Sequence, residues 1–123
     1  MICMSKFDVS RYERDPMDDK LKRVYVPMTE TAFYILFHLQ EERHGYDITQ
    51  KTKQVTAGQV VISPGTMYGT LSKMEKDGLI RFVREEDKRK FYRITETGRE
   101  ILDIELARIE RLYRNSKGGS YGD

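Results

Sequence analysis

The chain has 123 residues, of which 38% are hydrophobic and 34% are charged, and its formal net charge is +2. This length suits one folded domain with an ordinary core, and the composition is that of a globular rather than a disordered chain. The single cysteine, Cys3, excludes an intrachain disulfide, and with His38 and His44 it does not make a zinc-ligand set. No apolar run reaches the roughly 18 residues of a membrane span, and residues 1–10 lack the apolar core of a signal peptide. We therefore expect a cytoplasmic protein with no metal, cofactor or membrane partner.

The small net charge hides an uneven distribution along the chain. Residues 44–96 hold ten basic and seven acidic side chains, an excess of +3. Such an excess indicates nucleic-acid binding only if the basic side chains gather on one surface.

Residues 1–28 are predicted to form an N-terminal arm with one short helix. Residues 1–15 are polar and without periodicity, so we expect them to fray. Asp15 and Pro16 have the pattern of a helix N-cap followed by a proline at the first helical position, and Val26-Pro27 ends that helix.

A second helix is predicted to follow the N-cap candidate Thr29, over Glu30–Gln40. Its apolar residues cover most of the helix circumference, and the polar pole consists of Tyr34, His38 and Glu41. A helix of this kind is buried on more than one side. It is either the central core helix of a monomer or a helix whose second side, with Phe33 and Phe37, is covered by a partner subunit.

The segment from His44 to Gly78 contains two further predicted helices. The first runs from Tyr46 to about Gln54 and is broken by Gly58. The second begins after the N-cap Ser63 and Pro64, runs to Lys76 and stops at Gly78.

The helix after Ser63 has two contrasting faces. Met67, Leu71 and Met74 form an apolar stripe, and the opposite face is small, polar and basic. Glycine costs about 1 kcal/mol relative to alanine inside a helix. Gly69 on the polar face therefore indicates either close approach to another backbone or tight packing inside the fold.

Two strands are predicted next, over Leu79–Arg84 and Lys90–Ile94, joined by a five-residue loop over Glu85–Arg89. The basic cluster Lys88, Arg89 and Lys90 then lies at the tip of a hairpin. Three helices followed by a two-stranded hairpin are the order of a winged helix-turn-helix, whose last helix enters the DNA major groove. The acids Glu85–Asp87 oppose DNA binding unless their side chains point outward.

A last helix, capped by Thr95, is predicted over residues 96–114, followed by a flexible tail over 115–123. The helix is about 28 Å long, more than a small winged domain needs for its own core. We therefore predict that it pairs with a second subunit. The predicted dimer interface consists of Phe33, Phe37, Leu102, Leu106, Ile109, Leu112 and Tyr113.

Several short motifs along residues 29–112 resemble the PadR family of bacterial transcriptional regulators. They are His44–Ile48, Ser63–Tyr68, Leu71, Met74–Glu75, Gly78–Ile80 and Arg89–Arg99. The resemblance implies a mainly α fold with a two-stranded β wing, in which residues 29–95 form a winged helix-turn-helix and residues 96–114 a dimerisation helix. It also implies a homodimeric repressor that binds a palindromic operator in double-stranded DNA and leaves it when a small-molecule effector binds.

The resemblance places Tyr68 beside the phosphate backbone, Ser63 at the groove entrance, Thr66 and Lys73 facing DNA, and Arg89 and Lys90 in the wing. The predicted DNA-binding set is Ser63, Gly65, Thr66, Tyr68, Gly69, Ser72, Lys73, Lys76, Lys88, Arg89 and Lys90. Gly69 departs from the family pattern, which often has proline there.

The absence of tryptophan removes the indole platform that some drug-binding members place between subunits. Phe33, Tyr34, Phe37 or Tyr113 would instead line a pocket for a small aromatic or hydrophobic effector, or belong to the core.

The sequence also bears on two other classes of function. A winged helix also serves as a protein-interaction module, and the even charge balance permits this alternative; it predicts no salt-dependent binding to duplex DNA. An enzyme is not expected, because the chain has no nucleophile and base set, no phosphate-cradling glycine loop and no paired acids beside an apolar pocket.

Overall fold

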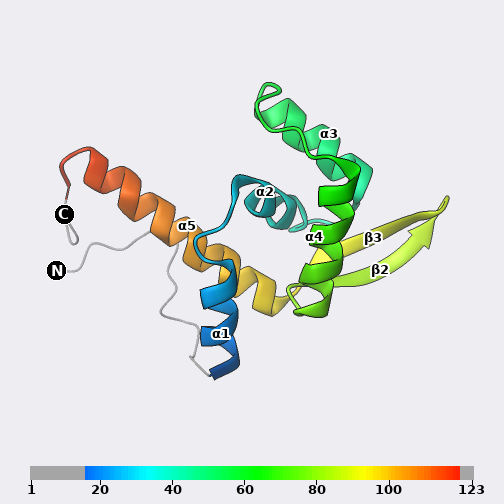
Figure 1. Cartoon of the computed structure of the whole chain (residues 1–123), viewed down its shortest axis with the longest axis horizontal. Coiled ribbons are helices and arrows are strands. Elements are labelled where there is room, and N and C mark those ends of the chain that lie inside the picture. The colour runs from blue at the N-terminus through cyan, green and yellow to red at the C-terminus, as the bar shows by residue number, and fades with distance from the viewer. Residues whose placement is uncertain (1–15, 120–123) are drawn as a thin grey trace. The chain divides into compact units, whose positions relative to one another are not determined.

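The computed structural model describes residues 16–119, which form five helices and three strands (Figure 1). The predicted fraying of residues 1–15, the Asp15 cap and the end of the tail lie outside the described residues. The elements are α1 (Pro16–Tyr25), α2 (Glu30–His38), β1 (Arg43–His44), α3 (Gly45–Val55), α4 (Pro64–Lys76), β2 (Ile80–Glu86), β3 (Arg89–Ile94) and α5 (Glu96–Ser116). The described residues fall into two compact units, residues 28–99 and residues 16–27 with 100–119.

The predicted winged helix-turn-helix of a mainly α chain is confirmed, with one addition to its sheet. The unit of residues 28–99 contains α2, α3 and α4 followed by the β2–β3 hairpin, which extends beside α4 in Figure 1. The sheet has three strands in the order β1-β3-β2, because Arg43 and His44 pair antiparallel with Tyr92 and Phe91. The sequence predicted only the two wing strands.

Helix α2 begins where Thr29 caps it, with the Ala32 amide donating to Thr29 Oγ1 at 3.1 Å. It ends at His38, two residues before the predicted end. Ile35, Leu36 and Leu39 are completely buried, as expected for a helix whose apolar residues cover most of its circumference. Phe33 is half-buried and Phe37 is 38% exposed.

The wing differs from the prediction in the length of its loop. Strand β2 continues through Glu86 and β3 starts at Arg89, so the connection is the two residues Asp87 and Lys88 rather than five. Both have positive φ, 51° and 64°, the backbone that a type I′ hairpin requires. A register shift between Phe82 and Arg84 marks a bulge in the strand pairing.

Helix α5 begins after Thr95, whose hydroxyl accepts from the Gly98 amide at 3.1 Å and donates to the Gly78 carbonyl at 2.6 Å. It continues to Ser116, so Asn115 and Ser116 are helical and not part of the predicted tail. Within its later part Glu105 is buried and makes two hydrogen bonds of 2.7 Å with Arg108. Over residues 16–119, no helix combines the length and the apolar character needed to cross a membrane.

His38 is buried, which corrects its predicted place on the polar pole of α2. Its ring stacks on Tyr34, and its Nε2 atom has no hydrogen-bond partner among the described residues. Burial lowers the pKa of His38, the positive charges of Arg43 and Lys51 lower it further, and Asp47 opposes them. His38 is therefore neutral in the folded protein at pH 7.

This burial predicts a pH dependence of stability. As the pH falls through about 6.5, His38 takes up a proton more readily in the unfolded chain than in the folded chain, so the free energy of unfolding should fall as the pH drops from 7 to 5. His44 contributes in the same direction, because its pKa is also lowered. Urea unfolding of the wild type and of His38→Gln at both pH values isolates the His38 contribution. An identical pH dependence in the two proteins would contradict the prediction.

Candidate nucleic-acid interface

Helix α4 is the best-defined element of the candidate interface. Ser63 Oγ accepts from the Thr66 amide at 3.2 Å and lies 3.0 Å from Thr66 Oγ1, and Pro64 occupies the first turn. Met67, Leu71 and Met74 are buried as predicted. The buried stripe fixes which face of α4 points to solvent, and the cap leaves the Ser63 hydroxyl engaged with Thr66.

All eleven residues of the predicted DNA-binding set are exposed. Eight of them lie on α4 or its cap, and they are Ser63, Gly65, Thr66, Tyr68, Gly69, Ser72, Lys73 and Lys76. Lys73 makes an ion pair with Asp77 at 3.0 Å, so its ammonium group lies along the last turn of α4.

The glycines of α4 lie on an open surface. A β carbon at Gly65 or Gly69 would meet no atom within 4 Å, so packing inside the fold does not account for Gly69. The tightly packed glycine is Gly45 at the start of α3, where a β carbon would lie 3.0 Å from Met67 Cγ and 3.4 Å from Tyr68 Cε1. Gly45 thus allows the start of α3 to lie close to α4.

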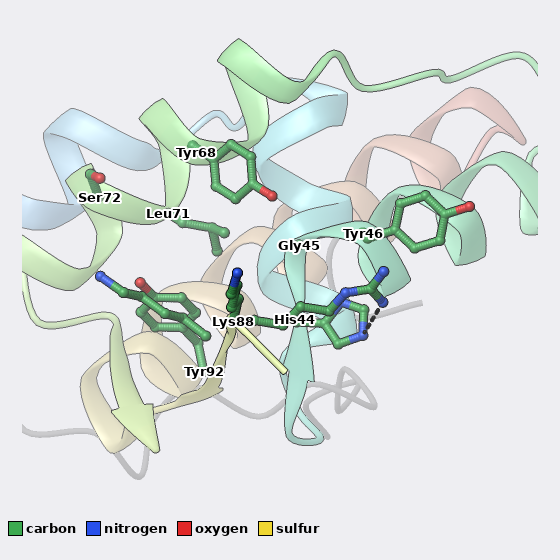
Figure 2. Close-up of a pocket in the computed structure, with 10 residues that line it drawn as sticks. His44, Gly45, Tyr46, Tyr68, Leu71, Ser72, Lys88 and Tyr92 are labelled. Atoms are coloured by element: carbon green, nitrogen blue, oxygen red, sulfur yellow. Dashed lines mark hydrogen bonds between the residues drawn. The ribbon is translucent and has the colours of Figure 1, made fainter. Parts of the chain in front are cut away.

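A cleft of about 510 Å³ lies between α4, the wing and the start of α3. Figure 2 shows Tyr68 and Ser72 on the α4 side and His44 and Tyr92 on the opposite side. Its ten lining residues are His44, Gly45, Tyr46, Tyr68, Leu71, Ser72, Lys88, Arg89, Lys90 and Tyr92. They include three cationic side chains and three tyrosines but no carboxylate, so the cleft favours an anion.

The cleft brings together five residues of the predicted set, Tyr68, Ser72, Lys88, Arg89 and Lys90. Tyr68 is 61% exposed, which leaves its ring available at the cleft. The guanidinium group of Arg89 lies over the ring of Tyr46, 5.1 Å from its centroid, and its Nη1 atom is 3.4 Å from His44 Nε2.

Sequence reasoning missed His44 and Tyr46 as lining residues. Both belong to the motif His44–Ile48, which in the sequence indicates only a turn and the family resemblance. Their contacts with Arg89 join positions more than 40 residues apart in the chain, so no local pattern marks them.

Two acids of the wing, Glu86 and Glu85, lie near cations. Arg84 pairs with Glu86 and, at 2.5 Å, with Glu42, and its guanidinium group lies 3.9 Å from the centroid of Phe91. Glu85 stands opposite Lys90 in the strand register. Neither Glu86 nor Glu85 lines the cleft.

The predicted dimer-interface residues differ in exposure. Leu102 is completely buried within the single chain, so its side chain is not available to a partner. Ile109, Leu112 and Tyr113 are exposed, and Leu106 is half-buried. The later part of α5 therefore presents an apolar face to solvent.

Comparisons with known proteins identify the family. The profile described as "Transcriptional regulator PadR-like family" matches residues 35–104. Transcriptional regulator Rv3488 of Mycobacterium tuberculosis is 36% identical over 90 residues, which cover 70% of this chain and 81% of that protein. Transcriptional regulator YqjI of Escherichia coli is 28% identical over 83 residues, which cover 68% of this chain but only 40% of YqjI.

Solved structures agree with this assignment. A PadR family transcription regulator from Clostridium difficile has a TM-score of 0.57 at 27% identity, covering 74% of this chain and 100% of that one. A transcriptional regulator from Clostridium thermocellum has a TM-score of 0.62 at 26% identity, covering 80% of this chain and 95% of that one. The matched residues include α4, the wing and the cleft between them. The chain belongs to the PadR-like family of transcriptional regulators.

Proposed function

We propose that this regulator is a homodimeric repressor that binds a palindromic operator in double-stranded DNA through α4 and the wing. The observation that carries the proposal is one exposed surface that combines the small polar face of α4 with the cationic cleft beside it. This surface gathers the positive excess of the middle of the chain, which the composition alone does not reveal.

In the proposed complex α4 enters the major groove, as the last helix of a helix-turn-helix does. Gly65 and Gly69 carry no side chain on the exposed face, so the backbone of α4 is able to approach the DNA closely. Thr66 and Ser72 supply hydroxyl groups for base edges or phosphates. The cleft takes a backbone phosphate between Tyr68 and the wing cations, and these contacts set the position of the helix.

The second subunit is proposed to pack against the later part of α5. A helix of 21 residues is about 32 Å long, and its exposed Ile109, Leu112 and Tyr113 lie on one stripe at helical spacing. A twofold pair of winged units then matches a palindromic operator, whose half-sites repeat the same contacts.

Relief of repression by a small aromatic or hydrophobic effector is part of the proposal. Phe33 and Phe37 stack with their centroids 5.8 Å apart, and Phe37 is partly exposed, so α2 offers an aromatic surface to such a molecule. Loss of operator binding on addition of the effector would test this part.

Salt dependence tests the DNA surface directly. Arg89→Ala and Lys73→Ala should each weaken binding to any duplex and flatten the slope of log K against log salt concentration by about one, because each cation releases one counterion from a phosphate. Fluorescence anisotropy of a labelled duplex at several salt concentrations gives these slopes.

The matched control for both variants is Arg93→Ala. Arg93 is an exposed cation at the base of β3 that does not line the cleft. The slope of log K against log salt concentration should therefore be the same for Arg93→Ala as for the wild type. Wild-type slopes in the Arg89 and Lys73 variants would remove both residues from the interface. Absence of any salt-dependent duplex binding by the wild type would favour a protein-interaction module.

A further inference from the structure

The side chain of His44 faces hydrogen-bond donors at both ring nitrogens. Its Nδ1 atom caps α3 by accepting from the Asp47 amide at 3.2 Å, and its Nε2 atom lies 3.4 Å from Arg89 Nη1, the contact dashed in Figure 2. A neutral imidazole has one donor and one acceptor nitrogen, and a guanidinium group only donates. Because Nδ1 is the acceptor, the proton of the neutral ring is on Nε2, and two donors face each other.

The His44 ring is neutral at pH 7 because its surroundings lower its pKa. Burial lowers the pKa of His44 first, the positive charge of Arg89 lowers it further, and Asp47 opposes both. The opposing donors are also held in place by their surroundings. Phe91 packs edge-on against the His44 ring with centroids 5.0 Å apart, and Arg89 lies over the Tyr46 ring.

The two donors lie side by side at a cleft that favours an anion. A single acceptor atom placed next to them accepts a hydrogen bond from each. An oxygen of a phosphate group satisfies both, since it carries negative charge and several lone pairs, and hydrogen bonds with a charged acceptor are the strong ones. Lys88 and Lys90 line the same cleft and supply further positive charge.

We propose that His44 Nε2–H and the Arg89 guanidinium group together bind one non-bridging oxygen of a DNA backbone phosphate in the cleft between α4 and the wing. This inference rests on the proposed function, and it adds a neutral phosphate ligand that is absent from the predicted DNA-binding set. His44 thereby links the N-terminus of α3, the wing and the DNA backbone through one side chain.

Two substitutions separate the phosphate donor from the helix cap. His44→Asn keeps an acceptor near the position of Nδ1, so it keeps the cap but removes the donor at Nε2. His44→Gln places an amide N–H near the position of Nε2 but lacks the short capping oxygen. Thermal unfolding and the anisotropy of a labelled duplex, measured for wild type and both variants, give the order of stability and the order of affinity.

The proposal predicts that the two variants rank in opposite orders for stability and for affinity. His44→Asn should be the more stable variant yet bind every duplex about tenfold more weakly than wild type, as expected for one lost hydrogen bond to a charged group. His44→Gln should be less stable but bind more tightly than His44→Asn. The salt slope of His44→Asn should equal that of wild type, because a neutral donor releases no counterion.

Other results would overturn the inference without touching the proposed function. If wild type binds the duplex and Arg89→Ala weakens that binding, but His44→Asn binds like wild type, His44 acts only as a cap. Weaker duplex binding by His44→Gln than by His44→Asn would likewise show that His44 acts only as a cap. If wild type binds no duplex at all, the proposed function fails together with the inference.

The phosphate bound in the cleft could belong to the DNA backbone or be a free inorganic phosphate ion. The ¹⁵N resonances of the His44 imidazole distinguish these two sources. Duplex DNA should shift the Nε2 resonance of His44 at protein-equivalent concentration and leave Nδ1 close to its position, because the cap stays in place. A shift with inorganic phosphate at equal ionic strength but none with duplex would assign the cleft to a free anion and overturn the proposal.

Discussion

Replacing Gly98 by alanine is expected to lower the free energy of unfolding by about 3 kcal/mol. A β carbon there would overlap the carbonyl oxygen of Leu79 and lie 2.8 Å from Ile94 Cγ1. The Leu79 oxygen also accepts from the Thr95 amide at 3.0 Å, and the Thr95 hydroxyl binds both the Gly98 amide and the Gly78 carbonyl. The new methyl group therefore collides with backbone that cannot move without breaking the start of α5.

The matched control is Gly69→Ala, which adds the same methyl group where no atom lies within 4 Å. It should raise the free energy of unfolding by up to about 1 kcal/mol, because alanine is the better helix former. Urea unfolding of both variants, with the slope m compared to confirm two-state behaviour, measures the two effects. Equal stability of Gly98→Ala and wild type would show that the contact at Leu79 relaxes freely. Gly69→Ala should also weaken duplex binding if α4 lies close to DNA.

A charge placed on the apolar face of α5 is expected to produce monomers that bind DNA about a hundredfold more weakly, since a single winged unit loses the gain from binding two half-sites at once. Ile109→Glu is the sharper variant, because Ile109 is 40% exposed in the single chain and its replacement leaves the core intact. Leu106→Glu should act in the same way, with some loss of stability because Leu106 is half-buried.

Light scattering after size exclusion gives the mass of each variant, and anisotropy gives its affinity. Arg111→Glu is the control, since Arg111 is exposed and lies on the side of α5 opposite Ile109 by helical spacing. It should remain a dimer. Dimers of normal mass in both Leu106→Glu and Ile109→Glu would place the subunit interface elsewhere in the chain.

The sequence predicted the elements whose signals are local. Ser63 and Pro64 mark the start of α4, the spacing of Met67, Leu71 and Met74 marks its buried face, and Thr29 and Thr95 mark two further helix starts. In each case the pattern lies within one or two turns of the helix. Capping and helical periodicity therefore suffice to place α4, and with it the candidate interface.

The length of the wing loop was mispredicted because the strand ends on either side of the turn carry no apolar alternation. Glu85, Glu86 and Arg89 are exposed, so nothing in their hydropathy distinguishes strand from loop. The turn itself uses positive φ at Asp87 and Lys88 without a glycine, which removes the usual hairpin signal. Strand β1 was missed because its two residues are defined only by pairing with Phe91 and Tyr92.

The cleft depends on contacts that no local pattern encodes. The sequence placed Arg89 at a solvated hairpin tip, whereas its guanidinium group lies over the Tyr46 ring and beside His44, at the start of α3. The position of His44 before a helix permits its capping role. Its Nε2 atom comes close to Arg89 only when the wing folds beside the start of α3. Long-range packing thus turns two separate motifs into one anion-favouring surface.

The most direct test of the central claim is the fluorescence anisotropy of labelled duplexes titrated with the wild-type protein at two salt concentrations. One duplex carries the DNA upstream of the protein's own gene, and the other is its scrambled sequence. The account predicts tight binding that weakens steeply with salt, with a large preference for the upstream duplex. Failure to bind either duplex in a salt-dependent manner would contradict it and indicate that the winged surface contacts protein instead.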